Sequence, residues 1–125
     1  MSDNLWPTDF GETDKKTPVG ILREQAQALG TRTANIVVGR VTTETYMGKF
    51  RHSFHLWCSP LGFETPLFHI VHGMDLYPVE IFLHPEPRGF ASASNQEEFT
   101  NRLKEIFSRE ETKKTIGVLL AQSKQ

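Results

Sequence analysis

The chain contains one cysteine, Cys58, among its 125 residues. A single cysteine excludes a disulfide within the chain and a zinc site of the CxxC type. The sequence also has no apolar run near the roughly 18 residues that a membrane-spanning helix needs, and no charged start followed by an apolar core. We therefore expect no membrane association and no secretion signal, with the cytoplasm as the default location.

An excess of charge of either sign is missing as well. The 14 Lys and Arg residues and the 15 Asp and Glu residues leave a formal net charge of −1. Bulk positive charge therefore cannot drive binding to nucleic acid, and the basic residues are not interleaved with aromatic residues for base stacking. No P-loop, GxGxxG or GxSxG motif occurs. We expect no nucleic-acid partner and no cofactor.

Length and composition fit one domain without a metal or disulfide to stabilise it. A globular chain of this size buries roughly 65–70% of the surface that its unfolded form exposes. Residues 1–16 are polar and turn-rich, which predicts a flexible N-terminal arm before a single domain over 17–125. The arm carries two large aromatic residues, Trp6 and Phe10. The alternative is a flap that docks these two rings on the domain or on a partner.

Capping and stop signals predict three helices. Thr17 is a good N-cap for a helix over 18–29, and Gly30 is a natural stop. Ser94, with a glutamate three residues later, fits a capping box at the start of a second helix. The same pattern recurs at residue 108, which predicts a break there and a short third helix.

The middle of the chain is rich in β-branched and aromatic residues and is interrupted by glycine at regular intervals. This pattern predicts four strands, over 35–46, 49–58, 63–72 and 77–84. The connections are short, so the strands should form an antiparallel meander. The predicted fold class is α+β, ordered α-ββββ-αα, with the N-terminal helix and both C-terminal helices packed on one face of the sheet.

Turn chemistry predicts the pairing of neighbouring strands. A two-residue turn at Met47-Gly48 and a three-residue loop ending at Gly62 set the first two hairpins, and a four-residue loop over 73–76 sets the third. The resulting cross-strand pairs are Tyr46 with Lys49, Glu44 with Arg51, Ser59 with Phe63, Phe54 with Phe68, His52 with Ile70, His72 with Tyr77, Ile70 with Val79, and His69 with Glu80.

These registers divide the sheet into an apolar face and a mixed face. The apolar face, called the inner face below, should receive the helices, because a slip of one residue would turn a strand's apolar set outward. Its predicted members are Val37, Val41, Phe50, Phe54, Leu56, Phe68, Ile70, Val79, Ile81 and Leu83.

The opposite side, called the outer face below, carries a predicted patch of Val38, Trp57, Leu67 and Phe82. A polar rim of both charge signs surrounds it: Arg40, Glu44, Arg51 and Glu80. Monomers rarely expose large apolar patches. The patch therefore predicts a covering element, which is a protein partner, a second copy in a homodimer, or the N-terminal arm; simple exposure is the remaining alternative.

A possible catalytic row also lies on the outer face. The registers place Ser53, His69 and Glu80 side by side, in the order of a nucleophile, a base and an orienting acid, with Arg51 near a substrate. A flat sheet offers no converging backbone N–H groups for an oxyanion. The simpler interpretation is a surface ion pair between the histidine and the glutamate.

The histidines do not predict a metal site. His52-x-x-His55 and His69-x-x-His72 have ligand-like spacing, but residues three apart on a strand point to opposite faces. Only cross-strand pairs, of His52 with His72 or of His55 with His69, could share a metal, and we expect none. Cys58 is expected to be a small core residue. A ligand pocket lined by phenylalanines 50, 54, 68, 99 and 107 is a further alternative to ordinary core packing.

The element order, size and near-neutral charge resemble those of small bacterial accessory proteins such as secretion chaperones or toxin-neutralising proteins, and this resemblance implies a binding role. Our principal hypothesis is a small non-catalytic protein-interaction domain that uses the outer face. The predicted partner-binding residues are Val38, Trp57, Leu67, Phe82, Arg40 and Arg51. The alternative is a small hydrolase or ligand-binding protein that uses the row of Ser53, His69 and Glu80.

Overall fold

The fold is an antiparallel sheet with helices before and after it, as the sequence predicts, and it has five strands where four are predicted. The computed structural model describes residues 4–12, 16–85 and 88–125. The strands follow one another across the sheet in the order β1-β2-β3-β4-β5. The elements are α1 (Pro18–Arg32), β1 (Val37–Tyr46), β2 (Lys49–Cys58), the 3-10 turn η1 (Ser59–Leu61), β3 (Phe63–His72), β4 (Val79–Leu83), β5 (Arg88–Ala93), α2 (Gln96–Phe107) and α3 (Glu110–Ser123).

The first helix begins where the sequence predicts and ends later. The Thr17 hydroxyl accepts a hydrogen bond from the Gly20 backbone N–H at 3.0 Å, so this residue is the N-cap. Gly30 is not the stop, because α1 continues to Arg32. Its lack of a side chain instead allows close packing, since a Cβ there would lie 3.1 Å from Cγ1 of Val38.

The β1–β2 hairpin has the predicted register. Tyr46 pairs with Lys49, and Glu44 with Arg51. The turn residues Met47 and Gly48 have φ values of 51° and 75°. Positive φ at both central residues is the type I′ geometry, whose twist matches that of the flanking strands.

The β2–β3 hairpin has the predicted register only in the half that lies away from its turn. His52 pairs with Ile70 and Phe54 with Phe68, but the register then shifts by one at a bulge, and His55 pairs with Pro66. Gly62 does have the left-handed conformation that its predicted loop position requires, with φ 59°.

The β3–β4 pairing differs from the predicted one by two residues. Ile70 pairs with Ile81, where Val79 is predicted. The connection is longer than four residues because β4 begins only at Val79, after Pro78, and a proline has no N–H to donate to a ladder. A slip of two preserves the side-chain alternation, so each residue of β4 still points to its predicted face.

The fifth strand was not predicted from the sequence. β5 reads RGFASA, whose glycine, alanine and serine residues have weak strand propensity. It forms an edge of the sheet by pairing with β4. The following helix, α2, begins one residue later than predicted, because Asn95 is the N-cap and its Oδ1 accepts from the Glu98 backbone N–H at 2.9 Å.

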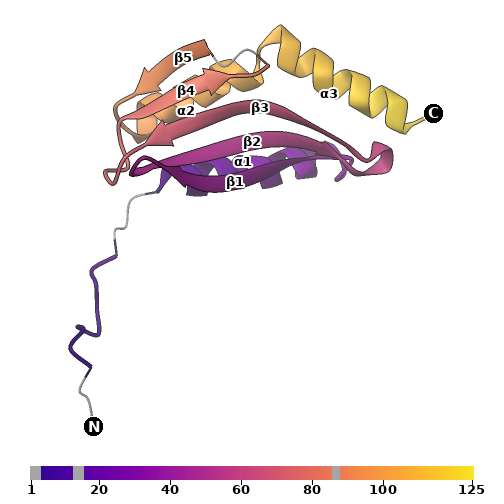
Figure 1. Cartoon of the computed structure of the whole chain (residues 1–125). Coiled ribbons are helices and arrows are strands. Elements are labelled where there is room, and N and C mark those ends of the chain that lie inside the picture. Colours follow the sequence, from indigo (N-terminus) through magenta and orange to yellow (C-terminus); the bar gives the residue numbers. More distant parts are fainter. Residues whose placement is uncertain (1–3, 13–15, 86–87) are drawn as a thin grey trace.

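The inner face and the helices enclose the core. In Figure 1, α1 and α2 lie behind the sheet, and α3 continues from α2 toward the end of the sheet that holds the β2–β3 turn. The helices break at Ser108, as predicted. Most predicted inner-face residues are buried, and Val41 and Leu83 pack at the margin of the core. The fully buried members are Val37, Phe54, Leu56, Phe68, Ile70, Val79 and Ile81, together with Phe99 and Ile106 from α2.

Close contact between α1 and the sheet depends on Gly39 of β1. A Cβ at this position would lie 2.6 Å from both Cα and Cβ of Ala26 in α1, and 2.7 Å from Cζ of Phe54. The small size of Gly39 and Ala26 thus lets α1 pack closely against β1, which is an edge strand of the sheet. Cys58 is buried as predicted, and its Sγ lies 3.3 Å from the Ser123 hydroxyl of α3.

Candidate functional site

The outer face has an aromatic residue stacked on a cation at one end. The Arg40 guanidinium lies over the Trp57 ring, 4.6 Å from its centroid. Its Nη1 also lies 3.4 Å from Oε1 of Glu64, which stands on β3 directly opposite Trp57 of β2. Contacts on two sides hold the arginine in one place, so the pair forms a preorganised platform, called the Arg40–Trp57 platform below.

The predicted apolar patch is not continuous. Leu67 lies at the bulge in β3 and packs against the core, where it lines a cavity beside α1 and α3. Its prediction as an outer-face residue is therefore wrong, and the exposed Pro66 stands opposite His55 instead. Val38 does stand directly opposite Trp57, and its Cγ1 also packs beside Gly30 of α1. The bulge thus separates the Arg40–Trp57 platform from Phe82.

The predicted row of Ser53, His69 and Glu80 is only half formed. Ser53 and His69 are directly paired across β2 and β3. The partner of His69 on β4 is Phe82, whereas Glu80 pairs with Val71. The predicted pairing of His69 with Glu80 is wrong because of the two-residue difference in the β3–β4 register. The orienting acid is therefore missing from the position that a triad requires.

A histidine pair takes the place of that row. His69 is buried, although it belongs to the outer face, because its ring stacks on Phe82 with centroids 4.9 Å apart. Its Nδ1 lies 2.8 Å from Nε2 of His84. Burial, together with the positive charges of Arg51 and His84, lowers the pKa of His69 from 6.5 to about 4. Burial, and then the positive charges of Arg51 and His55, lower the pKa of His84 as well.

A second histidine pair, also buried, lies on the inner face of β2 and β3. His52 and His72 face each other with their Nε2 atoms 2.9 Å apart. The other nitrogen of each ring, Nδ1, is also hydrogen-bonded. Nδ1 of His52 lies 2.8 Å from the Thr43 hydroxyl, and Nδ1 of His72 lies 2.8 Å from the Gly73 carbonyl. The ring of Phe50 stacks on His52, with centroids 6.3 Å apart.

The Gly73 carbonyl determines the direction of this chain of hydrogen bonds. A carbonyl only accepts, so Nδ1 of His72 carries a proton and, in the neutral ring, its Nε2 accepts from Nε2–H of His52. Nδ1 of His52 then accepts from the Thr43 hydroxyl. Burial, with the charges of His72 and Arg23, lowers the pKa of His52 to about 4. Every ring nitrogen has a partner while both rings are neutral.

Metal binding finds little support in this arrangement. Within residues 4–12, 16–85 and 88–125, no three His, Cys, Asp or Glu side chains converge as a ligand set. The inner pair, His52 and His72, has two facing nitrogens and no third ligand. In the outer pair, Arg51 lies near enough to His69 to lower its pKa, and such a cation would repel a metal ion.

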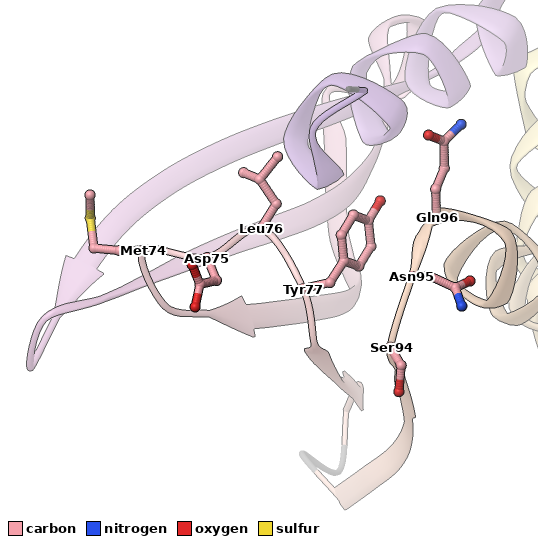
Figure 2. Close-up of a pocket in the computed structure, with 7 residues that line it drawn as sticks. All are labelled: Met74, Asp75, Leu76, Tyr77, Ser94, Asn95 and Gln96. Atoms are coloured by element: carbon pink, nitrogen blue, oxygen red, sulfur yellow. The ribbon is translucent and has the colours of Figure 1, made fainter. Parts of the chain in front are cut away.

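A pocket of about 600 Å³ opens between the β3–β4 loop and the N-terminus of α2 (Figure 2). Its lining residues are Met74, Asp75, Leu76, Tyr77, Ser94, Asn95 and Gln96. The Tyr77 hydroxyl is buried and has no hydrogen-bond partner among the described residues, and burial raises its pKa, so the phenol is neutral. Asp75 and the glutamates in the first turn of α2 offset the attraction of the helix N-terminus for anions.

A second, more apolar depression lies between α3 and the β2–β3 turn, and is called the apolar groove below. Its volume is about 470 Å³. It is lined by Leu61, Phe63, Lys114, Thr115, Val118, Leu119 and Gln122. Three of these apolar side chains remain substantially exposed: Phe63 and Val118 at 46% each, and Leu61 at 38%. Sequence reasoning missed the apolar groove because it forms only when α3 packs beside the turn.

The five predicted phenylalanines do not share one ligand pocket. Phe54, Phe68 and Phe107 pack together, with centroids 5.2 to 6.1 Å apart. Phe50 stacks instead with the inner histidine pair, and Phe99 contacts Tyr77. A cavity of about 300 Å³ does border the first cluster, between α1, α3 and the sheet.

Comparison of the chain with protein-family models, with curated proteins and with solved structures gave no match. Among the residues that the structure describes, no helix has the length and apolar character needed to cross a membrane.

Proposed function

We propose that the chain is a small non-catalytic protein-binding domain and that its outer face binds a protein partner. The observation that carries this proposal is the Arg40–Trp57 platform, which stands on the outer face of the sheet. Tryptophan and arginine are the residue types most enriched where interface binding energy is concentrated. Because Glu64 already orients the guanidinium, a partner would lose little side-chain entropy in docking there.

The chemistry of the outer face fits a separable partner better than a permanent one. Its aromatic side chains, Trp57 and Phe82, are half-buried, so a partner would cover little new apolar surface. Its charges alternate in sign, with Arg51 beside Glu44 at 3.5 Å. Non-obligate interfaces are about as polar as ordinary protein surface, whereas obligate dimers bury a more apolar one.

A hydrolase that uses Ser53 and His69 is the weaker alternative. Its triad would need Glu80 beside His69, and the register places Phe82 there. Nδ1 of His69 is already hydrogen-bonded to Nε2 of His84. Neither feature favours proton transfer from Ser53.

Site-specific photo-crosslinking tests the proposal. A benzoylphenylalanine at Thr42, an exposed outer-face position, should crosslink to a defined protein, whereas the same group at Thr31 of α1, also exposed, should not. The mass of the product distinguishes a different protein from a second copy of the chain. Equal crosslinking from the two positions contradicts the proposal.

Affinity measurements on the reconstituted complex complete the test. Trp57→Ala and Arg40→Ala should each weaken binding by at least about fivefold, because truncating an interface anchor of these types typically costs more than about 1 kcal/mol. Arg32→Ala, a matched exposed arginine on α1, should leave the affinity unchanged. Unchanged affinity in both outer-face variants overturns the proposal.

A further inference from the structure

Exposed apolar side chains gather in two places that are far apart in the sequence. Nine large apolar side chains are exposed among the described residues. Three of them belong to residues 4–12, called the arm below, and three line the apolar groove. Those of the arm are Leu5, Trp6 and Phe10, with exposed fractions of 93%, 73% and 71%. In Figure 1 the arm lies away from the sheet and the helices.

We propose that the arm of one chain docks in the apolar groove of a second copy, with Trp6 and Phe10 as its anchors. This surface is separate from the outer face, so the proposal stands or fails independently of the proposed function. Each copy has one arm and one groove. Reciprocal exchange would therefore close a symmetric pair, in which the same contact forms twice.

Local hydrogen bonds present the two anchors of the arm together. Oδ1 of Asn4 accepts from the Trp6 backbone N–H at 3.1 Å, and Oδ1 of Asp9 accepts from the Gly11 backbone N–H at 2.8 Å. The first bond closes a turn that ends at Trp6, and the second closes a turn around Phe10. The rings of Trp6 and Phe10 consequently lie 6.1 Å apart, as a single aromatic unit. A groove of about 470 Å³ is within the size range of sites that take such a unit.

The charges of the two elements are complementary. The arm carries two carboxylates, Asp9 and Glu12, and no lysine or arginine between residues 4 and 12. The apolar groove has Lys114 in its wall and no carboxylate among its lining residues. A lysine beside an apolar groove selects an aromatic segment with acidic residues over a basic one, and this pairing determines register more than strength.

The length of the tether favours a second copy over the arm's own groove. Pro18 follows Phe10 by eight residues, so the ring's Cα lies at most about 29 Å from the start of α1. The groove is at the opposite end of α1, because Val37 follows that helix, pairs with Cys58, and Cys58 pairs with Phe63. The helix alone spans about 22 Å.

Two strand spacings across the sheet add about 10 Å in the perpendicular direction. The two displacements combine to about 24 Å, so docking Phe10 in the groove of its own chain would need a tether stretched to about four-fifths of its maximum length. Nothing limits the reach of a second copy in this way.

Solution mass as a function of concentration is the first test. The full chain should change from 14.3 kDa to twice that mass between micromolar and millimolar concentration. The double variant Trp6→Ser, Phe10→Ser and the groove variant Val118→Asp should both stay at the lower mass. Met47→Asp is the matched control, because it places the same charge at an exposed apolar residue of a hairpin turn, and it should associate like the native chain. A native chain that stays monomeric at millimolar concentration overturns the proposal.

Binding of the isolated arm is the second test. A fluorescein-labelled peptide of residues 4–12 is titrated with the full chain carrying Trp6→Ser and Phe10→Ser, so that the peptide does not compete with the chain's own arm. Adding Val118→Asp to that chain should weaken binding more than tenfold, because docking the aromatic rings would strip water from the new carboxylate. Adding Met47→Asp should not. Equal binding to the two variants contradicts the placement.

Charge removal on both sides tests the pairing with Lys114. Lys114→Gln in the chain should weaken binding of the native peptide about two- to fivefold, which is the range of an exposed ion pair. The same substitution should have no effect on a peptide with Asp9→Asn and Glu12→Gln, which keeps the side-chain oxygen of the Asp9 turn. An equal loss with both peptides would overturn the role given to Lys114.

Discussion

Mild acid should destabilise this domain through its buried histidines. His52 and His69 have a pKa of about 4 in the folded chain, against 6.5 for an unperturbed histidine. A histidine whose folded pKa is depressed contributes stability above pH 6.5, and this contribution is lost as the pH falls toward 4. The unfolded chain binds the extra protons, so the free energy of unfolding decreases with falling pH.

The size of the effect follows from the two pKa values. At about pH 5, each histidine that must stay neutral in the folded state costs about 2 kcal/mol relative to pH 7.5. The two residues lie on opposite faces of the sheet, so their contributions should add to about 4 kcal/mol. Domains of this kind have a total stability of about 5–15 kcal/mol, so the loss is large.

Urea denaturation between about pH 7.5 and pH 5 measures this loss directly. The variants His52→Gln and His69→Gln should each have a flatter pH dependence, shallower by about 2 kcal/mol at pH 5, whatever their stability at neutral pH. Repeating the series at high salt separates burial from general charge repulsion, because only the latter is screened. A native chain with equal stability at both pH values, or variants with the native slope, would refute this reasoning.

Three further substitutions test the packing. Gly39→Ala should destabilise the domain by about 1–3 kcal/mol in thermal or urea unfolding, because the new Cβ would overlap Ala26 of α1, and wild-type stability would contradict that contact. Leu67→Asp should destabilise it by more than about 2 kcal/mol, whereas Pro66→Asp, its exposed neighbour, should not; equal effects would mean that the bulge is wrongly placed. Thr17→Ala should cost about 1 kcal/mol through the lost N-cap, and Thr17→Ser should restore most of it.

Local signals were sufficient for most of the helices and for two turns. Thr17 and the Met47-Gly48 turn are examples, because each depends on residues within a few positions along the chain. The apolar alternation of the strands likewise predicted the inner face, since only one arrangement buries it. These features made the α+β class and the helix-covered sheet predictable.

The candidate surfaces were less predictable, because they depend on neighbours from other elements. The bulge that turns Leu67 inward has one local signal, Pro66, because a central strand accommodates proline only at a bulge, and the predicted register did not use it. β5 has a composition that is weak for a strand. The apolar groove requires α3 to lie beside the β2–β3 turn, so long-range packing decides it.

The difference between what the sequence pattern determines and what the tertiary structure determines is clearest at His69. Side chains alternate with a period of two, so the apolar pattern alone assigned this residue to the outer face, and any slip by an even number of residues leaves that assignment unchanged. The same alternation does not determine which residue of β4 pairs with His69. The tertiary structure chose Phe82 over Glu80 as the neighbour of His69, and thereby placed a buried histidine pair where the sequence suggested an acid and a base.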